Sequence, residues 1–242
     1  TAIAGAVKRF APPESLTVDE WADKHRRLSP ESSAEAGPWR TKRTPYLEEP
    51  MRAFTDPKVH KIVMVAASQV GKSELELNII GYIIDQDPGS ILYVHPTIDD
   101  ARKFSRLRVA PMIRDSKPLK AKVHDVKAKD SGNTILGKRF PGGQLILTGA
   151  NSAVGLRSMP VRYLFLDEVD GYPLDVEGEG DAISLAEART RTFARRKIFI
   201  VSTPTISGAS AIEREYEASD QRRYFVPCPH CNHPQWLRFE QL

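Results

Sequence analysis

Short apolar runs and amphipathic segments alternate along the chain from residue 61 onward. The apolar runs, rich in β-type residues, predict strands at residues 61–65, 90–94, 162–166 and 197–201. Segments with apolar residues at helical spacing predict helices at residues 72–84, 98–108, 182–193 and 209–218. Strands that alternate with helices are typical of a parallel sheet with helices packed on its faces. The pattern therefore predicts an α/β fold.

Two segments depart from this alternation. Residues 134–150, TILGKRFPGGQLILTGA, predict an inserted β-hairpin, because the central Pro-Gly-Gly is a turn signal between β-type residues. Residues 1–60 are rich in proline and charge and predict one helix near residues 17–27, where a capping Thr17 precedes Glu20 by three positions. We expect residues 1–60 to form an arm that wraps the domain rather than a separate domain.

The composition is that of an ordinary folded protein. The 242 residues are 40% hydrophobic and 27% charged, which suits one large α/β domain with a sizeable core. Thirty-five Lys and Arg against 31 Asp and Glu give a formal charge of +4, which mildly favours a polyanionic partner. No apolar run approaches the roughly 20 residues that span a bilayer, and the first residues do not form a signal peptide. We therefore expect a soluble intracellular protein without a membrane partner and, because the chain begins without Met, a fragment.

The segment after the first predicted strand, AASQVGKS, has the spacing of a phosphate-binding loop in which alanine replaces the first glycine. Such a loop needs backbone N–H groups at a helix N-terminus, a lysine for the β and γ phosphates and a hydroxyl for Mg²⁺. The alanine is acceptable if it keeps a negative φ. The alternative is a chance Gly-Lys-Ser sequence after an ordinary core strand. The predicted ATP-binding residues are Ala66, Ala67, Ser68, Gln69, Val70, Gly71, Lys72 and Ser73, of which Ser73 would also hold Mg²⁺.

Two carboxylates follow the apolar run of the third predicted strand in YLFLDEVD. Asp167 is placed to hold Mg²⁺, and Glu168 to polarise the water that attacks the γ phosphate. An apolar strand that ends in Asp-Glu is often no more than a strand end. The phosphate loop upstream, in a chain with the pattern of a parallel sheet, favours the paired interpretation.

The fourth predicted strand ends in STPT, which puts small hydroxyl side chains at a strand tip. Ser202 and Thr203 can hydrogen-bond the catalytic carboxylate or the phosphate and report the nucleotide state to moving parts. The alternative is a strand-to-helix turn in which a hydroxyl merely caps the helix.

Phosphoryl transfer also needs positive charge on the departing phosphate. Arg157, in VGLRSMP before the acidic strand, is the first candidate, and four arginines compete with it: Arg102, Arg106, Arg189 and Arg191.

Residues 101–129 hold ten Lys or Arg, which could track a DNA backbone or could equally form a solvated helix face. The acidic, glycine-rich segment EGEGD at residues 177–181 has no role that the sequence indicates.

The segment CPHCNH contains a CxxC pair, Cys228 and Cys231, which is half of a tetrahedral zinc site. A second pair beyond Leu242 could complete the site, the local His230 and His233 could do so, or no metal binds. Our preferred hypothesis is a truncated zinc-knuckle-like linker that begins at residue 227 and holds Zn²⁺.

These segments, in this order and spacing, resemble the large terminase subunit of tailed bacteriophages in its lambda-type branch. The resemblance implies a P-loop NTPase fold of the RecA/ASCE-like kind, with an arm at residues 1–60, the ATPase domain at residues 61–226 and a linker at residues 227–242. It implies a motor that uses ATP and Mg²⁺ to drive double-stranded DNA into an empty capsid. Such a motor forms a ring on the portal protein and works with the small terminase subunit in the cytoplasm of the bacterial host. The resembling segments are EWADKHRRLSPESSAEAGPWRTKRTPY, AASQVGKSE, YVHPTIDDARKFS, KRFPGGQLILTGANSAVGLRSMP, YLFLDEVDGYP, STPTISGAS and YFVPCPHC.

The resemblance also assigns residues by position. The phosphate-loop pair, the Mg²⁺ residue, the catalytic glutamate and the coupling motif of the family match Lys72 and Ser73, Asp167, Glu168, and Ser202 with Thr203. Arg157 matches a trans-acting arginine of some related terminases. Three residues upstream of the loop lie where such motors contact adenine, although the two aromatic ones could equally be core residues: Trp39, Arg43 and Tyr46.

Large terminases of full length carry a C-terminal metal-dependent nuclease, and nothing after Leu242 is available to supply its acidic cluster. We therefore expect ATP hydrolysis without DNA cleavage. One alternative is the ATPase lobe of a helicase or translocase of a longer chain, because DEVD and STPT are similar to helicase motifs. Another is a nucleotide-sensing module without turnover, against which Glu168 argues, because binding alone needs no residue that activates water.

Overall fold

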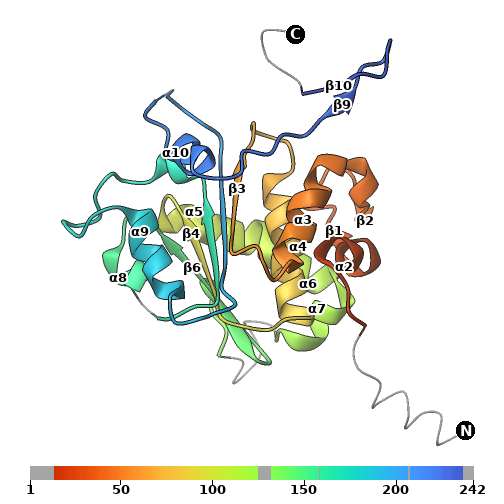
Figure 1. Ribbon diagram of the computed structural model, residues 1–242. Coiled ribbons are helices and arrows are strands. Elements are labelled where there is room, and N and C mark those ends of the chain that lie inside the picture. Colours follow the sequence, from red (N-terminus) through yellow and green to blue (C-terminus); the bar gives the residue numbers. More distant parts are fainter. Residues whose placement is uncertain (1–13, 125–131, 158, 207, 237–242) are drawn as a thin grey trace, which may run out of the picture.

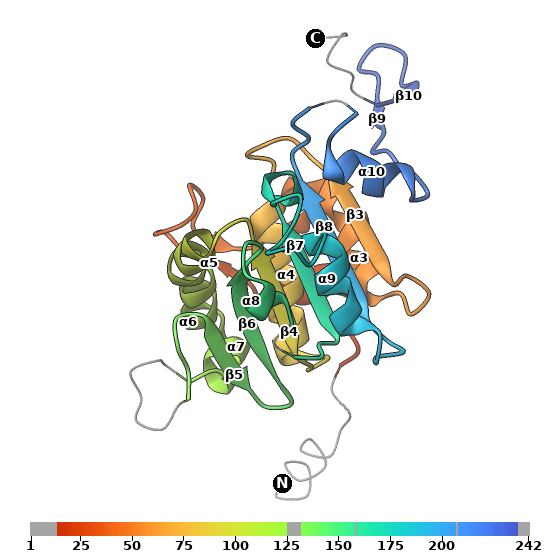
Figure 2. The same cartoon turned by 90° about the vertical axis from the view of Figure 1, so that its left-hand side faces the viewer.

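The computed structural model describes residues 14–124, 132–157, 159–206 and 208–236. Its centre is a six-stranded sheet in the order β3-β8-β7-β4-β6-β5, with helices on both faces (Figures 1 and 2). All neighbouring strands are parallel except β5, which pairs antiparallel with β6. This mostly parallel sheet confirms the predicted α/β class. The strands are β3 (Lys61–Val65), β4 (Ile91–His95), β5 (Gly137–Phe140), β6 (Gly143–Gly149), β7 (Tyr163–Asp167) and β8 (Lys197–Ser202).

The helices divide between the two faces of the sheet (Figure 1). One face packs against α2 (Val18–His25), α3 (Glu48–Thr55), α4 (Lys72–Asp85), α5 (Ile98–Phe104), α6 (Ala110–Asp115) and α7 (Lys117–Lys122). The other packs against α8 (Ala153–Arg157), α9 (Ala182–Glu187) and α10 (Ala211–Glu217). The remaining elements are β1 (Arg27–Leu28), β2 (Gly37–Pro38), η1 (Thr41–Arg43), η2 (Pro45–Leu47), η3 (Ser105–Val109), η4 (Val169–Gly171), η5 (Ala188–Thr190), β9 (Val226–Pro227) and β10 (Pro234–Gln235).

The two central strands explain why the sequence shows apolar runs rather than alternation. Every residue of β4 and of β7 is buried. Tyr93 and Phe165 pack into the core on the α4 side, whereas Leu92 and Leu164 pack into the core on the α9 side. A strand that is covered on both faces needs apolar residues at every position.

The N-terminal arm shares the core of the α4 side. Trp21 of α2 is fully buried, and its indole N–H donates to Oδ2 of Asp85 at 2.9 Å. Gly81 of α4 lies directly under this ring, because a Cβ at that position would be 2.3 Å from Trp21. The absence of a side chain therefore lets α2 approach α4 closely.

Most predicted elements are confirmed, and their ends differ by a few residues. The strand at 61–65 has the predicted bounds, and the hairpin at 134–150 forms as β5 and β6 around Gly142, which has φ +85°. The prediction for residues 98–108 is wrong at its end, because the helix continues through the π-helical η3 into α6. In the π-helical turn the N–H of Ala110 donates to Ser105, which widens the helix just before Pro111, the residue that would otherwise end it.

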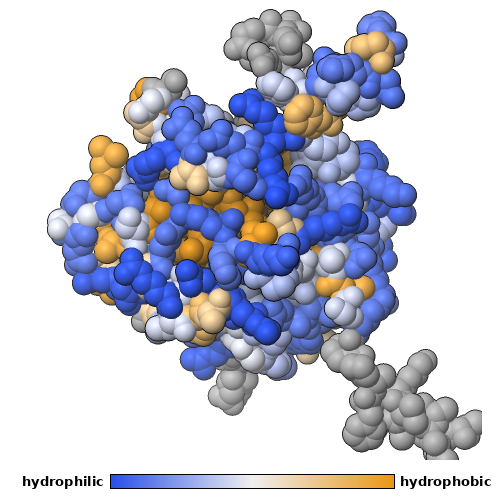
Figure 3. Space-filling model, viewed as in Figure 1, coloured by the Kyte–Doolittle hydropathy of each residue, from blue (hydrophilic) through white to orange (hydrophobic). Residues whose placement is uncertain are grey.

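The edge of the sheet at β3 is only partly covered. Val65 is 36% exposed, and the middle of β3 is only partly buried. Figure 3 shows apolar residues gathered in the middle of the face that Figure 1 presents, with polar residues around them. Among the described residues no helix has the length and apolar content needed to cross a membrane.

Candidate active site

The phosphate loop joins β3 to α4 with the backbone that its sequence predicts. Gly71 immediately before the helix has φ +89°, and Gln69 has φ +66°. Ala66 keeps a negative φ, and its N–H donates to the carbonyl of Ser202 at 3.2 Å. The alanine in place of the first glycine is therefore accommodated without strain, because a Cβ disfavours only the left-handed region.

Lys72, the first residue of α4, brings the loop into contact with the ends of β7 and β8. Its side chain is buried, and Nζ lies 2.8 Å from Oε1 of Glu168. The same ammonium donates a hydrogen bond to Oγ1 of Thr203. The three residues come from sequence positions far apart and meet because β8 lies between β3 and β7 in the sheet.

Glu168 is held in an unusual backbone conformation directly after β7. Its φ is +54°, and its N–H donates to the carbonyl of Val201 at 2.8 Å. Oε2 accepts hydrogen bonds from the N–H of Thr203 at 3.2 Å and from the hydroxyl of Ser202 at 3.3 Å. A left-handed residue other than glycine persists only where its surroundings impose it, and such residues cluster at functional sites.

Asp167, the last residue of β7, is buried beside this carboxylate. Burial, and then the charge of Glu168, raises the pKa of Asp167 to about 7. Nδ1 of His95, at the end of β4, lies 3.4 Å from Oδ2 of Asp167. Burial lowers the pKa of His95 to about 4, so the imidazole is neutral and this contact is not an ion pair.

A buried polar group that the sequence reasoning missed lies behind Asp167. The hydroxyl of Tyr93 donates to Oε2 of Glu76 at 2.7 Å, and burial, then the charge of Asp167, raises the pKa of both groups. Glu76 is fully buried, and desolvation, followed by the charge of Asp167, raises its pKa well above the ordinary value. The available signal was a glutamate four residues after Lys72 within an otherwise apolar helix face.

Arg157 lies at the end of α8 and contacts the acidic, glycine-rich segment. Its Nη2 is 2.7 Å from Oε1 of Glu179, and its Nε donates to the carbonyl of Ala153. Both side chains are partly exposed. The acidic, glycine-rich segment of residues 177–181, to which the sequence assigned no role, therefore holds Arg157, the first candidate for the cation on the departing phosphate. Among the competing arginines, Arg102 pairs with Asp99 on its own helix.

The basic stretch of residues 101–129 is largely committed to contacts within the protein. Five of its cations form ion pairs: Arg102 with Asp99, Lys103 with Asp100, Arg108 with Glu74, Arg114 with Glu31 and Asp115, and Lys122 with Asp85. Residues 125–131 lie outside the described residues. These pairs favour the structural interpretation of this stretch over a continuous track for DNA.

The three residues expected near adenine occupy different surroundings. Trp39 is 5% exposed and donates through its indole N–H to Thr41 at 3.0 Å, so it belongs to the core. Arg43 is exposed and pairs with Glu35. The hydroxyl of Tyr46 donates to the carbonyl of Val70 in the phosphate loop at 3.0 Å, and its ring packs against that of Tyr224.

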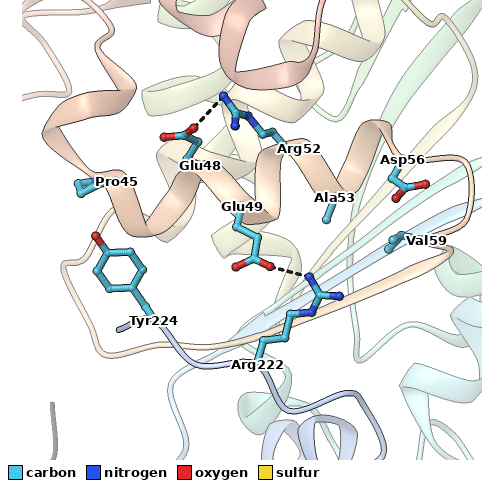
Figure 4. Close-up of a pocket in the computed structure, with 9 residues that line it drawn as sticks. All are labelled: Pro45, Glu48, Glu49, Arg52, Ala53, Asp56, Val59, Arg222 and Tyr224. Atoms are coloured by element: carbon cyan, nitrogen blue, oxygen red, sulfur yellow. Dashed lines mark hydrogen bonds and ion pairs between the residues drawn. The ribbon is translucent and has the colours of Figure 1, made fainter. Parts of the chain in front are cut away.

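A cavity of about 420 Å³ opens beside Tyr224, between α3 and the segment that follows α10 (Figure 4). Two ion pairs, Glu48 with Arg52 and Glu49 with Arg222, cross its wall. It borders neither the acidic pair nor the lysine of the phosphate loop. Its lining residues are Pro45, Glu48, Glu49, Arg52, Ala53, Asp56, Val59, Arg222 and Tyr224.

The CxxC pair lies in the short hairpin of β9 and β10. The N–H of Cys228 donates to the carbonyl of His233 at 2.9 Å, and hydrogen bonds from Cys231 and His230 lower the pKa of the Cys228 thiol. No group of three or more His, Cys, Asp or Glu side chains within the described residues is arranged to hold a metal. Within these described residues, His230 and His233 are thus not gathered with the two cysteines into such a group.

A phosphate loop, an acidic pair two strands away and a hydroxyl-bearing strand between them define a P-loop ATPase fold of the RecA/ASCE-like kind. Residues 33–242 match the family model described as phage terminase large subunit gpA, ATPase domain. The chain belongs to this family of terminase ATPase domains, which confirms the resemblance and decides against the helicase alternative.

The relatives agree with this assignment. The chain is 32% identical over 229 residues to the terminase large subunit of Escherichia phage lambda. The aligned region covers 94% of this chain and 35% of that protein. It is 30% identical over 240 residues to that of Enterobacteria phage P21, covering 98% of this chain and 37% of that protein. The chain thus spans about a third of the length of these curated relatives.

Solved structures support the fold. The HK97 bacteriophage large terminase superposes with a TM-score of 0.66 at 15% identity, over 84% of this chain and 41% of that chain. A mutant ATPase domain of the Thermus phage P74-26 large terminase gives a TM-score of 0.51 at 17% identity, over 79% of this chain and 76% of that chain. At these identities the likeness concerns the fold alone.

Proposed function

We propose that this domain hydrolyses ATP. The observation that carries the proposal is the contact between Lys72 and Glu168, whose Nζ and Oε1 atoms are 2.8 Å apart where the phosphate loop meets the end of β7. Hydrolysis requires a cation on the phosphates and a carboxylate that takes a proton from the attacking water, close to one another. A domain that only sensed a nucleotide would need the lysine but not the glutamate.

We infer Mg²⁺ as the cofactor. The hydroxyl of Ser73 in the first turn of α4 and the buried carboxylate of Asp167 supply the hard oxygen donors that Mg²⁺ prefers. Phosphate oxygens and water complete the coordination of this ion in nucleotide sites. When bound, the ion neutralises the charge that develops on the β and γ phosphates.

The protein's own groups then divide the work. The N–H groups of the phosphate loop cradle the phosphates, and Lys72 contributes the positive charge. Glu168 accepts the proton of the attacking water, while its other oxygen stays fixed by Ser202 and Thr203. Because Thr203 also accepts from Lys72, the end of β8 contacts both the phosphate-binding and the water-activating groups.

On the nucleoside side, we propose that Tyr46 is the principal contact of the three predicted residues, because its hydroxyl already binds the loop at Val70. The buried Trp39 donates a hydrogen bond to Thr41 and so supports the turn that precedes Tyr46. Arg43, exposed and paired with Glu35, contributes charge at the rim.

We propose that Arg157 stabilises the departing phosphate in a neighbouring subunit. Its side chain is 45% exposed, which leaves it accessible to a second copy. Glu179 holds it in the meantime through one ion pair. Such a pair at the surface contributes at most about 1 kcal/mol, so a phosphate can replace it.

We propose that the full-length protein is the DNA-packaging motor of a phage. It would move double-stranded DNA through the portal protein as a ring, together with the small terminase subunit, in the cytoplasm of the bacterial host. The names of the lambda and P21 relatives support this role.

Residues 1–60 would serve as an arm on the ATPase domain of residues 61–226. The linker of residues 227–242 would contribute Cys228 and Cys231 to a zinc site completed elsewhere. We expect no DNA cleavage from this chain alone.

The test is ATP hydrolysis with Mg²⁺ by the wild-type chain and by Glu168→Gln. We expect turnover in the wild type, and a loss of turnover in the variant by about 100-fold or more with ATP binding retained, because a general base contributes about 10²–10⁴. Glu217→Gln changes an exposed glutamate of α10 and serves as the control. Unchanged turnover in Glu168→Gln would show that the base is assigned wrongly.

A further inference from the structure

Asp170 lies on η4, two residues after Glu168, and binds two other segments of the chain. Its Oδ2 accepts hydrogen bonds from the N–H of Thr205 at 2.9 Å and from the hydroxyl of Thr205 at 3.0 Å. Its Oδ1 accepts from the N–H of Ile212 at 2.9 Å. A single carboxylate thus joins the end of the acidic strand, the segment after β8 and the first turn of α10.

The backbone of Asp170 also reaches the catalytic carboxylate. Its N–H donates to the hydroxyl oxygen of Ser202 at 3.3 Å, and that hydroxyl donates to Oε2 of Glu168 at 3.3 Å. Ser202 is fully buried, so water cannot easily replace these contacts. The same hydroxyl lies 3.2 Å from the carbonyl of Thr203, so Glu168 and this carbonyl share its hydrogen. The orientation of Glu168 is therefore linked through Ser202 to the backbone N–H of Asp170.

The electrostatics agree with a fixed carboxylate. Burial alone would raise the pKa of Asp170, but hydrogen bonds from Ile212, Ser210 and Thr205 outweigh it and hold the pKa below the ordinary value. The two hydrogen bonds from Thr205 and the one from Ile212 are charge-assisted, and they resist displacement more than neutral hydrogen bonds do. A movement of α10 would therefore carry Asp170 and Thr205 with it.

The chain beyond α10 returns to the phosphate loop. Arg222 pairs with Glu49 of α3 at 2.6 Å (Figure 4). The ring of Tyr224 packs on that of Tyr46, whose hydroxyl binds the loop. Figure 1 shows the same segment leading away from α10 past α3 to β9. The position of α10 is thus connected to both ends of the nucleotide site.

We propose that Asp170 is a positioning residue that couples the orientation of Glu168 to the position of α10, so that ATP turnover is linked to movement of the chain segment that follows α10. This inference rests on the proposed ATPase function. Asp170 touches neither nucleotide nor water in this scheme, and it acts through Ser202 and Thr205.

Asp170→Asn tests the proposal, because the amide keeps the size of the side chain but offers one acceptor oxygen instead of two. We expect kcat for ATP to fall by about tenfold, as for the loss of one charge-assisted hydrogen bond, with KM within about twofold of the wild type. The matched control is Asp181→Asn, because Asp181 accepts the N–H and the hydroxyl of Ser184 at the start of α9 in the same pattern. The control should leave kcat unchanged.

Hydrogen exchange of the α10 amides gives a second readout that a purely structural role would not move. In the wild type, a non-hydrolysable ATP analogue should change the exchange of residues 211–217, and in Asp170→Asn this response should disappear. Thr205→Val, which keeps the N–H but removes the hydroxyl, should reduce kcat by several-fold and remains informative if Asp170→Asn does not fold.

The outcomes separate the two proposals. A wild-type chain that binds ATP without hydrolysing it overturns the proposed function, and with it the kinetic part of this inference. A wild-type chain that hydrolyses ATP, with kcat unchanged in both Asp170→Asn and Thr205→Val, overturns the role of Asp170 alone. An α10 exchange response that persists in a folded Asp170→Asn variant overturns the coupling in the same way.

Discussion

The ammonium group of Lys72 and the carboxylate of Glu168 are in direct contact, with Nζ 2.8 Å from Oε1. The lysine thus pairs with the group proposed to activate water, and a phosphate bound to the loop would compete for the same ammonium. Substitutions of the two residues should therefore have different effects on ATP binding and on turnover. Lys72 contributes to ATP affinity, whereas Glu168 lowers this affinity slightly because it competes for the ammonium.

Substitution of these two residues should move ATP affinity in opposite directions. Lys72→Met should raise Kd for ATP by about tenfold or more, because a charge-assisted contact contributes about 1.5–3 kcal/mol. Glu168→Gln should leave Kd unchanged or lower it, because the amide competes less for the ammonium. Equilibrium titration with a fluorescent ATP analogue measures both. Equal weakening in the two variants would mean that the ion pair does not oppose phosphate binding.

Thr203 should affect turnover through its hydroxyl alone. Thr203→Val removes the acceptor for Lys72 but keeps the N–H that binds Glu168. Because the donor is an ammonium group, this hydrogen bond contributes about 1.5–3 kcal/mol, so kcat should fall by about tenfold or more. The control is Thr190→Val, which removes a buried hydroxyl that donates to Glu187 far from the loop in sequence. If both variants lose stability but neither loses kcat, the coupling role of Thr203 is wrong.

The sequence predicted the local parts of this site well and its long-range contacts poorly. The loop after β3 and the acidic pair at the end of β7 follow from short motifs next to apolar strands, and these strands lie within one residue of their predicted bounds. The contact between Lys72 and Thr203 depends on β8 lying between β3 and β7, which no local pattern specifies. The pairing of Arg157 with Glu179 likewise joins segments that only the folded sheet brings together.

Local sequence patterns also could not predict the surroundings of each side chain in the fold. Trp39 has the aromatic character of an adenine contact, yet it is part of the core. The basic stretch of residues 101–129 suggested a DNA track, yet five of the eight cations that the structure describes there pair with carboxylates on α4, α5, α6 and the arm. The sequence shows which residues are charged, but the partner of each charge becomes known only from the fold.

Gly81 should be essential for docking the N-terminal arm. Gly81→Ala would favour the helix by about 1 kcal/mol, but the new Cβ would meet the Trp21 ring at 2.3 Å. Overpacking of this kind costs about 1–3 kcal/mol, so we expect a net loss in the free energy of unfolding. Urea denaturation measures it. In a Trp21→Leu background the same change should become neutral or stabilising, and a penalty of equal size in both backgrounds would contradict the close contact.

Arg157 should matter only where subunits meet. Arg157→Ala removes the charge that we propose for a neighbouring active site, so hydrolysis should fall by about 10³-fold or more under conditions of assembly. Mixing Arg157→Ala with Glu168→Gln should restore part of the activity, because each variant supplies the group that the other lacks. Glu179→Gln, which frees Arg157 from its ion pair, should keep or raise turnover. Steady-state hydrolysis at several mixing ratios measures this. No recovery in mixtures that demonstrably assemble would place the arginine outside the reaction.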